Sequence, residues 1–336
     1  MSALYPFLMR PEFVERPWGT LDLSPVYPGH RCEKPVGEVW LTGDENRVAN
    51  GPLAGRTLGQ LCREYGRALV GESARETDRF PLLIKFLFSR EKLSVQVHPD
   101  DETARRAGLP CGKTECWYVV AAEPGAQVAL GLKSGVTREQ LARAIRDVQA
   151  EELLNWVDIH PGEMIYVDAG TVHTIGPGAI LLETQQNSDT TYRLYDYGRP
   201  REIHVEQGLA ATKERTRAGK VRPCGDPQMP NLITTGRFDI TRCKATSEKR
   251  GVVLSTNFPD WNSVEIIVAL GGTGVVEAPG SSPVDFSGGE AVVVPASFGE
   301  FEVYTKHGVE ILAICLPLTL DPTEGPATDR LEPVAT

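Results

Sequence analysis

Glycine and proline are spread throughout this chain, and that distribution limits it to folds built from short segments joined by many turns. The 336 residues include 33 glycines and 25 prolines. Both residues interrupt regular structure and favour tight turns. Between them lie short runs in which apolar and polar residues alternate, the pattern of strands with one buried face. The chain is therefore predicted to be mainly β, a sandwich or barrel with a small helical addition.

These runs define the expected strands and helices. Strands are predicted at 37–41, 81–88, 93–98, 112–120, 163–167, 179–186, 190–197, 263–270, 291–295 and 310–318. Helices are expected where threonine is followed three residues later by glutamine, because such a pair can form a capping box. Thr57 and Gln60 open a helix that reaches about residue 69, and Thr137 and Gln140 open one that reaches about residue 154. An aspartate start and a glycine stop predict a short helix at 100–108.

The length of 336 residues favours two domains. The first is predicted at 1–232, and its polar segment 211–232 is expected to be a linker. A second barrel, without metal ligands, is predicted at 233–320, followed by a C-terminal tail at 321–336.

A short internal echo bears on this division. The run GEMIYVDAGTVH at 162–173 can be laid over residues 289–300 at a constant offset. The second copy keeps the strand and the turn but has Glu300 where His173 stands, and it lacks a Gln-x-His partner. Either the echo arises by chance, or the chain holds two related barrels, of which only the first carries candidate metal ligands.

Composition and charge narrow the class of protein. The apolar content of 41% and charged content of 24% are typical of a soluble globular protein. The net charge of −10, without a Lys/Arg stripe, argues against nucleic-acid and membrane partners. No run of 18 apolar residues occurs, and the first residues do not form a signal peptide. Seven cysteines without a Cys-x-x-Cys pair indicate free thiols and a cytoplasmic location.

The predicted strand at 93–98 carries the first candidate site. Ser94, Gln96 and His98 alternate with apolar residues, so they share one face of the strand. Neighbours on that face are about 7 Å apart, which allows Gln96 and His98 to contact one metal ion. For an isolated Gln-x-His, the simpler interpretation is a histidine and an amide on a solvated sheet face.

Glu115 and His173, on two other predicted strands, complete a candidate metal site. A barrel brings inward-facing side chains from separate strands together. Gln96, His98, Glu115 and His173 form a nitrogen and oxygen donor set that suits one divalent ion, most simply Zn²⁺, with Mn²⁺, Co²⁺, Ni²⁺ or Fe²⁺ also compatible. The alternative is a set of unrelated polar residues on the barrel walls.

Two basic residues are expected beside this site. Lys113 shares a strand face with Glu115, and Arg193 lies on a later strand. Together they predict a local anion site in an acidic protein. Each of them can equally be an ordinary surface charge.

Four sequence runs resemble mannose-6-phosphate isomerases of the short bacterial type I form. They are LSVQVHPDD at 93–101, GKTECWY at 112–118, GTVHTIGPG at 170–178 and LETQQNSDTTYRLYDY at 182–197. The resemblance covers most of residues 15–215. That family has a cupin fold, which implies two cupin-type (jelly-roll) β-barrels. Gly162 and His173 fit the general cupin pattern, whereas Asp168 stands where proline is usual.

The resemblance also implies residue roles. By motif, Gln96, His98, Glu115 and His173 correspond to the metal ligands. Ser94 and Lys113 fall on positions that line the substrate pocket. Arg193 falls on the catalytic arginine, and Glu183 falls on a carboxylate proposed for proton transfer; Lys113 is the other acid/base candidate.

The expected activity is the interconversion of D-mannose 6-phosphate and D-fructose 6-phosphate through a cis-enediolate, an intramolecular oxidoreduction. Two alternatives come from other classes. A cupin metal-dependent oxygenase would need a redox metal and an apolar cavity, whereas Lys113 and Arg193 favour an anionic substrate. A non-catalytic sugar-phosphate-binding cupin would bind its ligand without turnover. The expected partner is a small sugar phosphate, and the sequence leaves the oligomeric state open.

Overall fold

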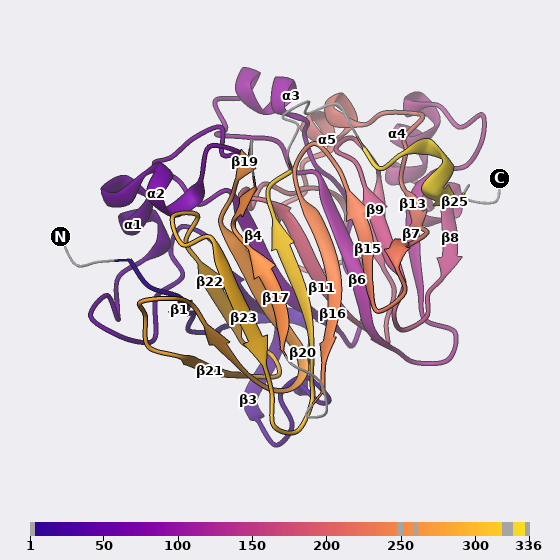
Figure 1. Cartoon of the computed structure of the whole chain (residues 1–336). Helices are drawn as coiled ribbons and strands as arrows, with labels where there is room; N and C mark the ends of the chain where they lie inside the picture. The colour runs from indigo at the N-terminus through magenta and orange to yellow at the C-terminus, as the bar shows by residue number, and fades with distance from the viewer. Residues whose placement is uncertain (1–3, 247–250, 259–260, 318–324, 333–336) are drawn as a thin grey trace.

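The computed structural model describes residues 4–246, 251–258, 261–317 and 325–332, and it is mainly β (Figure 1). Residue 318, at the end of one predicted strand, and half of the predicted tail, 321–324 and 333–336, lie outside the described residues. None of the helices in the described ranges is long and apolar enough to cross a membrane. All seven cysteines are free thiols, as predicted.

An eight-stranded antiparallel sheet lies at the centre of the structure. Its order is β2 (Glu12–Asp22), β3 (Arg31–Thr42), β4 (Leu82–Ser89), β11 (Ala179–Gln186), β6 (Glu115–Ala122), β9 (Met164–Val167), β13 (Gly219–Val221) and β25 (Leu331–Glu332). The predictions for 81–88 and 179–186 are confirmed by β4 and β11, and the prediction for 112–120 is confirmed from Glu115 onward by β6. Lys113 is predicted on this strand but lies in the segment just before it.

A five-stranded sheet covers one face of the central sheet. Its order is β12 (Tyr192–Tyr195), β5 (Val95–Val97), β10 (His173–Ile175), β7 (Gln127–Leu132) and β8 (Leu154–Asp158). Side chains of the two sheets share one apolar cluster, in which Trp117 and Val119 of β6 meet Val128 and Leu130 of β7.

A ten-stranded sheet covers the other face. Its main path is β1 (Phe7–Leu8), β22 (Ala291–Val294), β20 (Glu265–Glu277), β24 (Val309–Cys315), β16 (Asp239–Ala245), β15 (Met229–Thr234) and β14 (Cys224–Asp226). Off this path, β21 (Val284–Ser287) and β23 (Glu300–Tyr304) pair with β20, and β17 (Val252–Ser255) pairs with β23. A separate pair is formed by β18 (Asn257–Phe258) and β19 (Trp261–Asn262).

The helices are short and lie at the edges of the sheets, with α1 and α2 at one end of the molecule and α4 at the other (Figure 1). Their bounds are α1 (Leu58–Tyr65), α2 (Arg67–Val70), α3 (Asp101–Arg106), α4 (Arg138–Arg146), η1 (Ala150–Leu153), α5 (Val205–Ala211) and η2 (Thr328–Arg330). Both predicted capping boxes are present. The two predicted long helices are each divided, because Gly66 and Val148 adopt positive φ values of 50° and 61°. Such left-handed residues end an α-helix.

Strand alternation explains why β4 and β11 are buried on both faces. Ile84 and Phe86 belong to the apolar cluster shared with the ten-stranded sheet, whereas Leu87 belongs to the one shared with the five-stranded sheet. Lys85 alternates with Ile84 and Phe86, so it points the same way as Leu87. The central sheet thus supplies two cores, and Lys85 lies on the face where the site is found.

One prediction about architecture is wrong, and two others are not confirmed. The segment at 211–232 is not a linker, because it contains β13, β14 and part of β15. The alternation there is too short to detect by periodicity. The strand pairings among the described residues leave every sheet with open edges, so the two closed barrels are not confirmed. The domain bounds stay a prediction, although β1 and β25 cross them by pairing with the opposite part of the chain.

The internal echo has a structural counterpart. Strand β9 begins at Met164 and β22 at Ala291, while β10 begins at His173 and β23 at Glu300, so both pairs of strands keep the same offset. Gly162 and Gly289, which precede the first strand of each copy, have φ values of 91° and 85°. This left-handed conformation favours glycine.

The same turn is also closed by the same hydrogen bond. Glu163 Oε2 accepts from the backbone N–H of His160 at 2.8 Å, and Glu290 Oε2 accepts from that of Ser287 at 2.8 Å. A matching strand, glycine and carboxylate acceptor support two related units.

Glu265 of β20 occupies in the second unit the position that Glu115 occupies in the first. Glu115 lies opposite Val167 of β9, and Glu265 lies opposite Val294 of β22, the residue that matches Val167 in the echo. Glu265 is buried, and burial, followed by repulsion from Asp239, raises its pKa to about 8. Below that pH the native protein holds a neutral carboxyl group here.

This raised pKa predicts a pH-dependent penalty on stability. An unfolded glutamate titrates near 4.5, so the native state binds more protons between pH 4.5 and about 8 and loses stability as pH rises through that window. Glu265→Gln is expected to raise the free energy of unfolding at pH 8 by a few kcal/mol, the size set by the difference between the folded and unfolded pKa values of Glu265. At pH 4.5 the substitution should change the free energy of unfolding little. Urea unfolding at both pH values measures this. The matched control is Glu277→Gln at the exposed end of β20. An equal effect of the Glu265 substitution at both pH values would contradict the account.

Candidate active site

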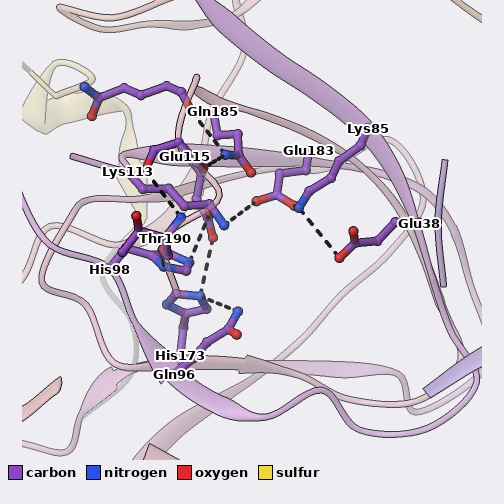
Figure 2. Close-up of polar contacts among 12 residues, drawn as sticks. Glu38, Lys85, Gln96, His98, Lys113, Glu115, His173, Glu183, Gln185 and Thr190 are labelled. Carbon is purple, nitrogen blue, oxygen red and sulfur yellow. Dashed lines mark hydrogen bonds and ion pairs between the residues drawn. The ribbon is translucent and has the colours of Figure 1, made fainter. Parts of the chain in front are cut away.

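The structure brings the four predicted metal ligands together between the central and five-stranded sheets (Figure 2). Gln96 and His173 are direct partners across β5 and β10. Glu115 lies between the two histidines, with Oε2 3.5 Å from His98 Nε2 and Oε1 3.4 Å from His173 Nε2. The ligand atoms of His98, Glu115 and His173 lie within 4.8 Å of one another, close enough to hold one ion.

Backbone carbonyls orient both imidazole rings. His98 Nδ1 lies 2.9 Å from the oxygen of Thr190, and His173 Nδ1 lies 2.9 Å from the oxygen of Thr171. A carbonyl can only accept, so each Nδ1 carries the proton and each Nε2 presents a lone pair to the centre. Burial lowers the pKa of His98 well below its usual value and that of His173 to about 4. Both rings are therefore neutral at pH 7, the form that binds metals.

The unsatisfied atoms at the centre fit a bound cation. Among the described residues, His98 Nε2 and Glu115 Oε2 are buried without a hydrogen-bond partner. An unsatisfied buried atom such as His98 Nε2 costs roughly 1–3 kcal/mol unless something coordinates it, whereas Glu115 Oε2 has the Lys113 ammonium 3.2 Å away as an ion-pair partner. Two imidazole nitrogens and one carboxylate suit a divalent ion of the Zn²⁺ type.

Gln96 completes the donor set after a simple rotation. Its Nε2 lies 3.1 Å from His173 Nε2, and Ser94 Oγ lies 3.2 Å from its Oε1. A half-turn of the amide brings Oε1 to the centre, and Nε2 can then donate to the Ser94 hydroxyl. Ser94 therefore supports Gln96 in either orientation.

A row of alternating charges runs away from the metal ligands (Figure 2). Lys113 Nζ lies 3.2 Å from Glu115 and 3.5 Å from Glu183. Lys85 Nζ lies 3.4 Å from Glu183 and 3.7 Å from Glu38. All of these side chains are buried, so each charge depends on its neighbours.

Strand register places this row. Glu183 of β11 lies directly opposite Lys85 of β4, and side chains of directly opposed residues share one face of a sheet. Burial raises the pKa of Glu183, but Lys85 and Lys113 outweigh it and bring the pKa to about 2. Burial and the neighbouring Glu183 charge instead raise the pKa of Glu115 well above its usual range. The pKa values of the two carboxyl groups are thus shifted in opposite directions.

Sequence reasoning does not find Lys85, Glu38 and Arg16. Arg16 donates to Glu38 at 2.8 Å and extends the charged row to the surface. A detectable signal is Lys85, a lone charge inside the apolar run at 81–88. Glu38 and Arg16 carry no comparable signal, because charged residues are ordinary on half-exposed strands.

A cavity of about 400 Å³ opens beside the ligands. Its lining includes Ser94, Lys113, Glu183 and Arg193 of the predicted set. Apolar walls come from Trp18 and other side chains of the shared core: Leu87, Leu93, Trp117 and Ile175.

Arg16, Arg193 and Arg201 give the cavity a positive region. Arg201 pairs with Asp196 through two 2.6 Å contacts. Arg193 Nε is buried and has no hydrogen-bond partner within the described ranges. Burial, with the Arg201 charge second, lowers the pKa of Arg193. The arginines therefore share one electrostatic environment that suits an anion.

The charged row predicts the consequence of removing one lysine. Lys85→Met leaves Glu183 and Glu38 buried without their shared cation, and it is expected to cost about 3–5 kcal/mol of unfolding free energy. Chemical denaturation measures the loss. The control is Lys92→Met, because the Lys92 side chain is 41% exposed. Its ion pair with Glu151 should contribute about 1 kcal/mol or less. A Lys85→Met variant that is as stable as the control would contradict the dependence of these carboxylates on Lys85.

Comparison with known proteins gives a consistent result. Residues 19–151 match the family model described as phosphomannose isomerase type I, catalytic domain. Mannose-6-phosphate isomerase ManA of Bacillus subtilis strain 168 is 35% identical over 89% of this chain and 95% of its own length.

Solved structures agree with the fold. The mannose 6-phosphate isomerase from Bacillus subtilis superposes with a TM-score of 0.80 at 30% identity, over 92% of this chain and 99% of that one. A zinc-bound mannose 6-phosphate isomerase shares the fold, with a TM-score of 0.74 at 15% identity, over 93% of this chain and 100% of that one. Identity and coverage at the level of the ManA match show that the chain belongs to the type I mannose-6-phosphate isomerase family.

Proposed function

We propose that the protein interconverts D-mannose 6-phosphate and D-fructose 6-phosphate, as an aldose–ketose isomerase and therefore an intramolecular oxidoreductase. One observation carries the proposal: a Gln, His, Glu, His donor set, in which both histidines and the glutamate are buried, lies beside an ion-paired Lys113 and Glu183 in a cavity with arginines. The cavity volume of about 400 Å³ is in the range of small-molecule sites. Relatives of this family carry the same activity in their names.

In this proposal Gln96, His98, Glu115 and His173 hold one divalent ion, with Zn²⁺ the best match to the donors. The ion supplies Lewis acidity, which stabilises negative charge on the substrate oxygens. Thr171 and Thr190 keep the two rings oriented through their carbonyls.

Glu183 and Lys113 are the candidates for moving the proton between C2 and C1. Their side chains lie 3.5 Å apart, so both can reach one small region of the cavity. Lys85 keeps Glu183 ionised and able to accept. Arg193 can stabilise negative charge on the enediolate, because its guanidinium lines the cavity.

The phosphate is assigned to the positive region, with Arg201 as its main contact. Its bidentate pairing with Asp196 fixes the guanidinium plane, and a rigid arginine is well suited to phosphate oxygens. Arg16 contributes charge from the cavity lining as well. Ser94 lines the substrate cavity near Gln96.

The oxygenase alternative shares part of this site, because two histidines and a carboxylate can also hold iron. The charges of the cavity disfavour it. Lys85, Lys113 and Glu183 form a polar wall, whereas an oxygenase for apolar substrates needs an apolar one. A binding protein without turnover would not need the ionised Glu183 beside Lys113. We further propose that the chain forms two cupin-type units, one at 1–232 and one at 233–320, and that only the first unit holds a metal site.

The decisive test is a coupled assay of mannose 6-phosphate isomerisation on chelator-stripped protein, repeated with Zn²⁺, Mn²⁺ and Co²⁺ restored singly. We expect activity to be lost on stripping and regained with at least one ion. Turnover that survives complete stripping would contradict the metal assignment. A folded, metal-loaded protein without turnover would favour the binding protein or the oxygenase.

His98→Ala is expected to abolish stoichiometric metal binding and to lower kcat/KM by about a hundredfold or more, because a buried ligand is removed. Elemental analysis gives the metal content and the coupled assay gives the rate. His160→Ala is the control, since the His160 side chain is 70% exposed and lies outside the site. Full activity in metal-free His98→Ala protein would overturn the site.

Arg201→Gln should lower kcat/KM for mannose 6-phosphate by roughly tenfold to a hundredfold, the range for losing a charge-assisted hydrogen bond. Any residual turnover of free mannose should not change. Arg199→Gln is the matched control, because Arg199 also pairs with Asp196 but does not line the cavity. If both variants behave alike, the effect acts through Asp196 and the phosphate assignment is wrong.

A further inference from the structure

A second cavity, of about 250 Å³, lies where the first half of the chain meets the ten-stranded sheet. Its walls come from the segment before β4, from α3, from the β15–β16 turn and from the end of β24. It shares no lining residue with the substrate cavity. The proposed isomerase chemistry makes no use of it.

This cavity is electropositive in an otherwise acidic protein. Its lining includes four arginines, Arg75, Arg79, Arg105 and Arg237. Only two carboxylates, Glu76 and Asp101, line it with them. The formal balance is two positive charges, whereas the whole chain carries −10.

Both carboxylate oxygens of Asp101 already have partners within the protein. Its Oδ1 accepts from the Gly112 N–H at 2.8 Å and from Gln186 Nε2 at 2.9 Å. Its Oδ2 pairs with Arg237 and lies 3.6 Å from Arg75. One carboxylate therefore serves two arginines and has no capacity left for a third.

Two nitrogen groups remain available for an anion. Arg237 Nε is buried without a hydrogen-bond partner among the residues that the structure describes. Arg105, one turn along α3 from Asp101, makes no ion pair within the described parts of the chain. Arg79, by contrast, is occupied by Asp44 at 2.9 Å and by the carbonyl of Asn187 at 3.0 Å.

Part of the remaining wall is apolar, although Ser73, Gln186 and Asn187 also line the cavity. Phe80, Pro81, Leu82, Leu316 and Pro317 line the cavity, and Phe80 and Leu82 belong to the main core. An inorganic anion alone would leave this surface uncovered. A ligand with both an anionic group and a flat or ring-shaped body would use both parts of the cavity.

We propose that this cavity binds a small phosphate monoester that carries a ring, at a site separate from the substrate cavity. A phosphate monoester bears about two negative charges at pH 7. With Arg79 neutralised by Asp44, the wall keeps one surplus positive charge to meet them. Arginine donors match phosphate oxygens in geometry as well as charge. The apolar wall receives the ring and adds area-dependent affinity.

Calorimetric titration of the metal-loaded protein with phenyl phosphate tests this. Inorganic phosphate serves as the ringless anion and benzyl alcohol as the neutral ring. We expect phenyl phosphate to bind at the second cavity more tightly than either control. The double variant Arg105→Gln/Arg237→Gln should weaken binding by about tenfold or more, since both groups that remain available to an anion are removed. Arg146→Gln, on exposed α4, should leave the affinity unchanged.

The substrate cavity also suits phosphate monoesters, so Arg201→Gln provides the second control. Phenyl phosphate binding at the proposed site should persist in Arg201→Gln. Loss of binding in Arg201→Gln but not in the double variant would place the ligand in the substrate cavity and overturn the proposal. Absence of any binding heat would overturn it too, and equal affinity for inorganic phosphate would refute the role of the ring. Binding is measured without turnover, so the result is independent of the isomerase assignment.

Discussion

The buried ion pair between Lys85 and Glu183 is the interaction on which the rest of the site depends. It joins β4 and β11, two neighbouring inner strands of a sheet that is covered on both faces, where an unpaired charge would cost several kcal/mol. With Lys85 in place, Glu183 stays ionised, and Lys113 can be shared between Glu183 and Glu115. The charged side chains on the polar side of the cavity can stay ionised while buried because each of them has a neighbour of opposite charge.

A comparison of the two related units shows how neighbouring charges change the behaviour of a buried glutamate. Glu115 and Glu265 hold the same register position in their sheets. Glu115 has Lys113 and two imidazoles around it, whereas Glu265 lies beside Asp239 and Cys315, and its pKa rises to about 8. The same strand geometry can thus hold either part of a metal site or a neutral buried acid. The neighbouring side chains decide which.

Much of the fold and of the site is predictable because it depends on local patterns. A continuous apolar run predicts β4, the strand patterns at 112–120 and 179–186 predict β6 and β11, and Thr-x-x-Gln pairs predict both capping boxes. The donor set can be proposed because a Gln-x-His pair on a strand has few other uses beside a Glu and a further His. Short strands such as β13 and β14 escape prediction, because three residues are too few to show a period. Closed barrels are expected from the sequence, but the pairings among the described strands leave the sheets open.

The sequence alone determined the mainly β composition, the helix starts and the chemical types of the candidate ligands, because these follow from neighbouring residues. Only the tertiary structure decided which charges share a cavity. Lys85 of β4 meets Glu183 of β11, and Arg237 meets Asp101 across 136 positions of sequence. Such contacts arise from strand register and sheet packing, and electrostatic energies depend on distance and burial rather than on order in the chain.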